Sequence, residues 1–159
     1  PDEANHLMNG LDWVGATEQD VRGAVQYLKT RGGHVAVMGF CMGGTIAFFA
    51  GAQWQLGAAI TFYGGGIVMG RFGLPTLLEM VPQLKTPWMG NYGDLDQSIP
   101  LTEVEVLRRA VAASGTPVEV NRYPEADHGF HCSDRSAWHE ASSKDAWAKT
   151  VKFLDSHVG

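Results

Sequence analysis

The sequence predicts an α/β fold, with a parallel sheet of about four strands flanked by helices. Short apolar stretches of strand length alternate with longer stretches of helical periodicity, as in parallel sheets whose strands are joined by helices. Three of the expected strands are followed by stretches with reactive side chains, and parallel sheets bind their ligands at the carboxyl ends of strands. Because 159 residues is the length of one domain, residues 1–159 are predicted to form a single unit.

The first half of the chain contains two expected helices and a strand between them. Residues 1–16 are mixed and polar, which favours a loop or a short irregular helix. A helix is expected over 18–31, with Thr17 as its N-cap, because apolar residues then recur at helical spacing. The apolar stretch 34–39 is expected to be a strand. The stretch 45–53 is expected to be a buried helix, since it is apolar on nearly all sides.

The second half continues the alternation. The remaining expected elements are a strand over 57–63, a loop over 67–74, a short helix over 76–84, a strand over 86–91, a helix from Pro100 to about Gly115, a strand over 117–123 and a final helix over 137–157. Proline at the start of a helix and glycine past its end are typical boundary signals. The final helix carries Trp147, Val151 and Leu154 on one face.

Composition and charge argue against several classes of function. The net charge is −5 and the sequence has no cluster of Lys and Arg, so no electrostatic footprint for nucleic acid is present. No apolar run reaches transmembrane length, and no membrane partner is expected. Cys41 and Cys132 do not make a disulfide framework. A working thiol fits a reducing compartment, so a cytoplasmic location is expected.

A glycine-rich turn at 39–44 (Gly-Phe-Cys-Met-Gly-Gly) carries the most informative chemistry. It lies between an expected strand and an expected helix, which is the context of a nucleophile elbow with Cys41 at its apex. A Cβ at Gly39 or Gly43 is expected to collide with nearby backbone in so tight a turn. The positive end of the following helix favours a thiolate at Cys41. The alternative interpretation is a buried structural cysteine at a glycine-rich junction.

Two later stretches supply an acid and a histidine. Asp94 and Asp96 follow the third expected strand, and His128 follows the fourth. The order along the chain is therefore nucleophile, acid, histidine, as in α/β-hydrolases. An imidazole can take the proton of a thiol, and an acid can fix the tautomer and orientation of that imidazole. Either aspartate also fits ordinary turn chemistry, and His131, three residues after His128, is a rival for the base.

Together these three stretches resemble the dienelactone hydrolase family, the carboxymethylenebutenolidases. The elbow of that family, Gly-x-Cys-x-Gly-Gly, is matched at 39–44. The acid of the family lies in Gly-x-x-Asp-x-x-x-Pro, matched by Gly93, Asp96 and Pro100, so the resemblance favours Asp96 as the acid. The histidine stretch of the family is matched by Tyr123, Ala126, His128, Gly129 and Phe130. The resemblance covers about residue 17 to the end of the chain.

The resemblance implies a truncated α/β-hydrolase fold that cleaves small esters or lactones. It implies that Cys41 is the nucleophile, that His128 carries the proton and that Asp96 orients His128. The backbone N–H of Met42, directly after the nucleophile, would stabilise the oxyanion. Family members are longer at the N-terminus, and their second oxyanion donor and an N-terminal glutamate have no counterpart in this sequence. No cofactor and no metal are implied.

The missing N-terminal part has a consequence for partners. The strand over 34–39 would be central in a complete fold, and without a neighbour it would present an unpaired apolar edge. A homo-oligomer, or association through this sheet edge, is therefore expected. The alternative function is a non-catalytic binding or assembly module that keeps the elbow as architecture. Candidate aromatic residues for a substrate pocket are Tyr63, Trp88, Phe130 and Trp138.

Overall fold

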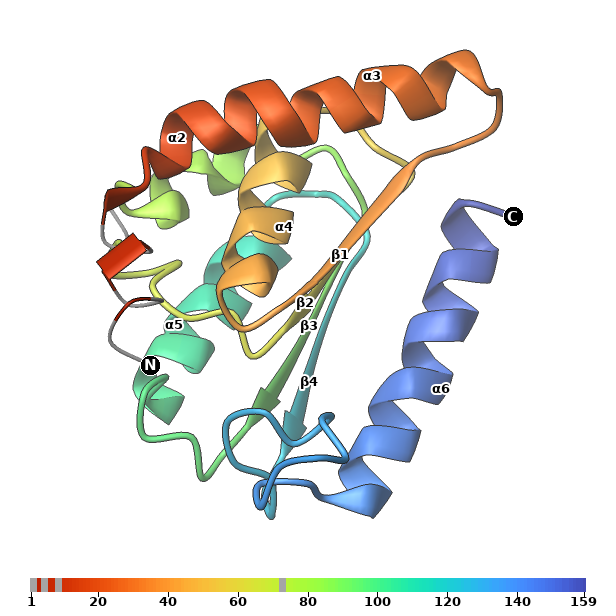
Figure 1. Ribbon diagram of the computed structural model, residues 1–159. Coiled ribbons are helices and arrows are strands. Elements are labelled where there is room, and N and C mark those ends of the chain that lie inside the picture. Colours follow the sequence, from red (N-terminus) through yellow and green to blue (C-terminus); the bar gives the residue numbers. More distant parts are fainter. Residues whose placement is uncertain (1–2, 4–5, 8–9, 72–73) are drawn as a thin grey trace.

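The computed structural model describes residues 3, 6–7, 10–71 and 74–159. These residues form a four-stranded parallel sheet in the order β1-β2-β3-β4 (Figure 1). The strands are β1 (Ala36–Phe40), β2 (Ala58–Phe62), β3 (Trp88–Gly93) and β4 (Val118–Tyr123). The observed sheet confirms the predicted parallel fold of four strands, and it leaves β1 and β4 as the two edges.

Helices cover both faces of the sheet, as the sequence predicted. Figure 1 shows α4 and α5 on one face and α6 on the other, with α2 and α3 running across the outside of α4. The helical elements are α2 (Trp13–Ala16), the π-helical turn η1 (Thr17–Val21), α3 (Arg22–Thr30), α4 (Met42–Gln53), the 3₁₀ helix η2 (Leu77–Gln83), α5 (Leu101–Ala112) and α6 (Glu140–His157). Among the described residues, no helix has the length and apolar character needed to cross a membrane.

The first helical segment begins earlier than predicted. Asp12 caps α2, since its side chain accepts a hydrogen bond from the Gly15 N–H at 3.0 Å. Thr17 is therefore not an N-cap; it is buried within the continuous helical run, and its hydroxyl donates to the Trp13 carbonyl at 2.7 Å. The short helix at Trp13–Ala16 agrees with the loop or short irregular helix expected over residues 1–16. Residues 1–2, 4–5 and 8–9 lie outside the described part of the chain.

The last helix, α6, packs against β2 and β3. It begins at Glu140 rather than at residue 137, with His139 as its N-cap. Its buried side chains include Ala146, Thr150 and Phe153. Trp147 and Val151, which the sequence placed on one apolar face with Leu154, are exposed. Helical spacing alone therefore identified an apolar face but not the face that the sheet buries.

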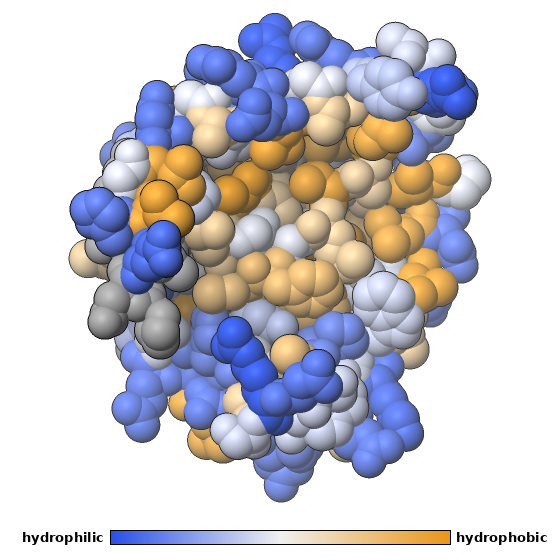
Figure 2. Space-filling model, in the orientation of Figure 1, coloured by the Kyte–Doolittle hydropathy of each residue, from blue (hydrophilic) through white to orange (hydrophobic). Residues whose placement is uncertain are grey.

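The two inner strands carry the core. Every residue of β2 and β3 is buried. In β1, by contrast, Met38 and Phe40 are both 39% exposed. Figure 2, in the orientation of Figure 1, shows apolar side chains gathered across the hollowed middle of this face and hydrophilic side chains around its rim. The apolar edge expected from the sequence is therefore present at β1.

Candidate active site

Cys41 lies at the apex of a sharp turn between β1 and α4. Its backbone has φ 54° and ψ −121°, a conformation that a non-glycine residue rarely adopts. A Cβ on Gly39 would overlap the carbonyl of Gly43, and one on Gly44 would come within 2.7 Å of the Phe62 carbonyl oxygen. Gly43 itself has open space around its Cβ position. The steric prediction was right for Gly39 and wrong for Gly43, since the close approach to β2 falls on the next residue.

The loops after β3 and β4 are tied together, and this brings the acid and the histidine to the same place. The Asp94 N–H donates to the Tyr123 carbonyl at 2.9 Å, and the Leu95 N–H donates to the Ala126 carbonyl at 3.0 Å. A Cβ on Gly93 would overlap that Ala126 carbonyl, so the two loops approach closely where β3 ends. Three residues after Gly93, Asp96 faces the loop that carries His128.

The structure brings the three predicted side chains into one line. His128 Nε2 lies 3.1 Å from Cys41 Sγ, and His128 Nδ1 lies 2.6 Å from Asp96 Oδ2. The Asp96 side chain is only 2% exposed, whereas that of His128 is 26% exposed and Cys41 is exposed. A buried carboxylate, an imidazole and an accessible thiol therefore lie in series, from the protein interior outward.

The two rival residues are engaged elsewhere. Asp94 accepts two hydrogen bonds from the Arg122 guanidinium, at 2.9 and 2.6 Å. His131 Nδ1 lies 2.7 Å from the Ser143 hydroxyl, and its ring stacks between Phe40 and Trp147. Of the alternatives that the sequence left open, the structure places His128 and not His131 against the thiol, and Asp96 and not Asp94 against His128.

The electrostatics of this line favour a thiolate next to an imidazolium. The hydrogen bond with His128 lowers the pKa of the Cys41 thiol, and the backbone N–H of Met42 and the charge of Arg71 act in the same direction. The hydrogen bonds with Asp96 and then with Cys41 raise the pKa of His128 to about 9. Burial alone would raise the pKa of the Asp96 carboxyl, but hydrogen bonds from His128 and from its own loop hold it below the ordinary value.

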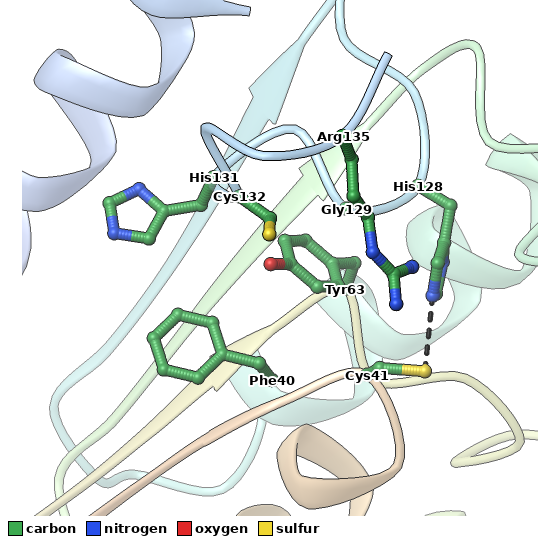
Figure 3. Close-up of a pocket in the computed structure, with 8 residues that line it drawn as sticks. All are labelled: Phe40, Cys41, Tyr63, His128, Gly129, His131, Cys132 and Arg135. Carbon is green, nitrogen blue, oxygen red and sulfur yellow. Dashed lines mark hydrogen bonds between the residues drawn. The ribbon is translucent and has the colours of Figure 1, made fainter. Parts of the chain in front are cut away.

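A cavity of about 440 Å³ opens beside the thiol. It is lined by Phe40, Cys41, Tyr63, His128, Gly129, His131, Cys132 and Arg135. Figure 3 shows Cys41, His128 and Arg135 toward one end of this pocket and Phe40 and His131 toward the other. A volume in this range suits a small molecule.

The structure places only one of the four aromatic residues predicted from sequence among the residues that line the pocket. Tyr63 lines the pocket and, like Cys41, has a positive φ, here 38°. Burial raises the pKa of its hydroxyl to about 12. Trp88 and Phe130 are fully buried in the core, and Trp138 lies outside the lining residues. Phe40 was missed as a wall, although its place beside the nucleophile was a usable signal.

The part of the chain that the structure describes contains no group of three or more His, Cys, Asp or Glu side chains able to hold a metal ion. Met42 begins α4, and its backbone N–H lowers the pKa of the Cys41 thiol. The thiol, the imidazole and the backbone N–H groups of this site can perform nucleophilic and acid–base chemistry.

Comparison with known proteins identifies the family. The sequence profile described as "Dienelactone hydrolase family" matches residues 1–158. The chain belongs to the dienelactone hydrolase family. The match begins well before residue 17, where the motifs placed the start of the resemblance, so that estimate was too short.

Curated relatives and solved structures agree with this assignment. A Yersinia pestis protein named "Putative carboxymethylenebutenolidase" is 34% identical over 125 residues, which cover 77% of this chain and 47% of the relative. An Escherichia coli K12 protein of the same name is 31% identical over 145 residues, covering 88% of this chain and 54% of the relative. The chain therefore spans about half the length of these curated relatives.

The fold is shared with solved structures that are titled as a hydrolase and an esterase. A crystal structure titled "Putative Dienelactone Hydrolase", from Klebsiella pneumoniae, superposes with a TM-score of 0.75 at 31% identity, covering 86% of this chain and 59% of that one. The Pyrococcus furiosus esterase Pf2001 superposes with a TM-score of 0.74 at 17% identity, covering 94% of this chain and 66% of that one. At that lower identity the likeness shows the α/β-hydrolase fold alone.

Proposed function

We propose that this chain is a thiol-dependent hydrolase of small esters or lactones, in which Cys41, His128 and Asp96 act as a catalytic triad. The observation that carries the proposal is the continuous line of hydrogen bonds from Asp96 through His128 to the Cys41 sulfur. That line ends at a thiol on the wall of a pocket of about 440 Å³. Membership of the dienelactone hydrolase family supports the same reaction class.

The first half of the proposed reaction forms a thioester. The Cys41 thiolate attacks the ester carbonyl carbon, and the electron pair of the C=O bond moves onto oxygen. The Met42 N–H donates a hydrogen bond to that oxyanion. When the carbonyl re-forms, the C–O bond to the alcohol breaks, and the imidazolium of His128 gives its proton to the departing oxygen.

The second half returns the enzyme to its starting state. Neutral His128 takes a proton from water, and the resulting hydroxide attacks the thioester carbonyl. The C–S bond breaks, the carboxylic acid leaves, and the thiolate and imidazolium pair is restored. Asp96 holds His128 Nδ1–H throughout, so that Nε2 faces the sulfur and the substrate.

The test is hydrolysis of p-nitrophenyl acetate by the wild type and by Cys41→Ala. The expected result is a loss of kcat/KM of about 10³-fold or more in the variant, because Cys41 Sγ is the nucleophile that His128 Nε2 contacts. Cys132→Ala removes the second thiol of the same pocket. We expect that variant to keep turnover within about tenfold of wild type, since Cys132 lies outside the hydrogen-bonded line.

Equal rates in wild type and Cys41→Ala would overturn the hydrolase proposal. The second candidate function, a non-catalytic binding or assembly module, would then hold. The observation that favours it is the exposed apolar face of β1, where Met38 and Phe40 are each 39% exposed. Such a face beside an unpaired strand edge is typical of a surface that another chain covers.

We further propose that the chain associates through the β1 edge with a second copy of itself, and that it works in the cytoplasm. An unpaired strand edge offers free N–H and C=O groups to a strand of another molecule. Both cysteines are free thiols, which fits a reducing compartment. Sedimentation velocity over a range of protein concentrations tests the association, and a particle that stays monomeric throughout would contradict it.

A further inference from the structure

Asp96 is held by a residue that the family motif does not include. The Ser98 hydroxyl donates to Asp96 Oδ1 at 2.6 Å, and the Ser98 backbone N–H donates to the same oxygen at 2.8 Å. The second carboxylate oxygen, Oδ2, lies 2.6 Å from His128 Nδ1. In the described part of the chain, these groups account for the hydrogen bonds that the carboxylate accepts.

We propose that Ser98 is a positioning residue of the active site, which fixes the plane of the Asp96 carboxylate so that Oδ2 faces His128. The hydrogen bonds from Ser98 also act to lower the pKa of that carboxyl group. The inference rests on the proposed function for its catalytic consequence. Its structural basis is independent of the reaction, because the three hydrogen bonds exist whether or not an ester is cleaved.

The geometry gives Ser98 this role for two reasons. The side chain of Asp96 is only 2% exposed, and a buried charged acceptor left short of hydrogen bonds is costly. The paired donors also fix rotation, because hydroxyl and N–H approach the same oxygen from one residue two positions along the chain, an arrangement typical of an Asx turn. Without the hydroxyl, the carboxylate keeps a single donor on Oδ1 and can rotate about its bond to Cβ.

Ser98 also lies close to the imidazole itself. Its oxygen is 3.4 Å from His128 Nδ1, so an oxygen lone pair faces the ring while the hydroxyl proton points to the carboxylate. The charged group that faces Asp96 directly is His128, from the loop after β4. Cys41 lies beyond His128, and Arg71 acts on the charge of Cys41. Ser98 therefore adds an uncharged hydrogen-bond donor beside the charged groups of Asp96, His128 and Cys41.

The experiment compares Ser98→Ala, Ser98→Thr and Gln97→Ala in two assays. The first assay is hydrolysis of p-nitrophenyl acetate, and the second is the pH dependence of Cys41 alkylation by iodoacetamide, followed at the Cys41 peptide by mass spectrometry. Gln97 is the exposed neighbour of Ser98 and has no part in the site, so its variant is the matched control. The alkylation assay measures the thiolate and needs no turnover.

We expect Ser98→Ala to lower kcat about tenfold, the effect of one hydrogen bond to a charged group, with little change in KM. The acid limb of its alkylation profile is expected to move to higher pH, because the carboxylate that supports the imidazolium protonates more readily. Ser98→Thr keeps the hydroxyl and is expected to restore both properties, and Gln97→Ala to change neither.

The two assays separate the two proposals. A shifted alkylation profile in Ser98→Ala that Ser98→Thr restores would support the positioning role even if no ester is hydrolysed, and only the hydrolase proposal would then fail. An alkylation profile and a kcat that both match wild type in Ser98→Ala would overturn the positioning role. A loss that Ser98→Thr does not restore would overturn it as well, because the hydroxyl would not be the cause.

Discussion

The two edges of the sheet are built in opposite ways. β4, at one edge, carries Glu119 and Arg122, and Arg122 is held in ion pairs with Asp94 and Glu105. β1, at the other edge, reads Ala-Val-Met-Gly-Phe and has no charged side chain. Charged side chains on an edge strand discourage pairing with another chain. The edge at β4 is therefore protected, and the edge at β1 is open.

The open edge is also the one that carries the nucleophile. Cys41 follows β1 directly, and the turn after β1 is the tightest part of the site. The acid and the histidine come from the loops after β3 and β4. The comparison shows that strand ends and loops are enough to align Cys41, His128 and Asp96 by hydrogen bonds. The side chains of β1 next to the nucleophile remain exposed.

The largest effect is expected at the turn after β1. Gly39→Ala should lower the free energy of unfolding by about 3 kcal/mol or more, because the new methyl group overlaps the Gly43 carbonyl and backbone must move. Gly43→Ala is the matched control in the same turn. It should be neutral or stabilising by up to about 1 kcal/mol, since its Cβ position is open and alanine favours helix. Urea unfolding of both variants checks this, and similar losses would mean that the turn is not the constraint.

The next effect contrasts β1 with its buried neighbour. Met38 and Ile60 are paired across β1 and β2, yet Met38 is 39% exposed and Ile60 is fully buried. Ile60→Ala should cost about 2–5 kcal/mol of unfolding free energy, and Met38→Ala about 1 kcal/mol or less. Denaturant unfolding at low protein concentration gives both values. Equal losses would show that the face of β1 is covered in solution.

The sequence predicted the elements whose signals are local. Apolar runs placed all four strands, and the elbow was readable because glycines and a cysteine lie within six residues. The choice of Asp96 over Asp94 came from the resemblance to the acid motif of the family, and the structure places Asp96 against His128. That residues 1–159 form a single domain stays a prediction.

The features that sequence missed depend on contacts between distant segments. Whether Gly43 or Gly44 needs to lack a Cβ is decided by the path of β2. The pocket walls come from three separate turns, so Phe40 and Arg135 could not be grouped from spacing. The role of Ser98 depends on the rotation of a carboxylate, which no residue pattern encodes.

A smaller effect is the pH dependence of the free energy of unfolding, to which Cys41 and His128 contribute with opposite signs. The folded pKa of His128 is raised to about 9 from the ordinary 6.5. Its contribution to stability is therefore complete below pH 6.5 and is lost as the pH rises toward 9. The folded pKa of Cys41 is lowered from 9.0, so its contribution is complete above pH 9 and is lost as the pH falls. Between these values the two slopes oppose each other.

Removing the Cys41 thiol should therefore leave the pH dependence of the unfolding free energy that His128 causes. In Cys41→Ala the unfolding free energy should fall more steeply between pH 6.5 and 9 than in wild type, by about 1–2 kcal/mol across the window, because Asp96 still raises the pKa of His128. Urea unfolding at several pH values measures both slopes. Identical slopes would argue against an ion pair between the thiol and the imidazole.

The smallest effect on the folded chain, and the most direct test of the open edge, comes from a charge placed on β1. Met38→Lys should leave the monomer folded, because the side chain is exposed, but should weaken self-association about tenfold, because a lysine on an edge strand opposes pairing with a second copy. Val106→Lys is the matched control, since Val106 is 41% exposed on α5 and lies outside β1. If both variants dissociate alike in sedimentation velocity, the contact lies elsewhere. If Met38→Lys alone dissociates and also loses esterase activity, the second copy completes the exposed side of the nucleophile, and the contrast between the two edges would then explain why β1 is left without charge.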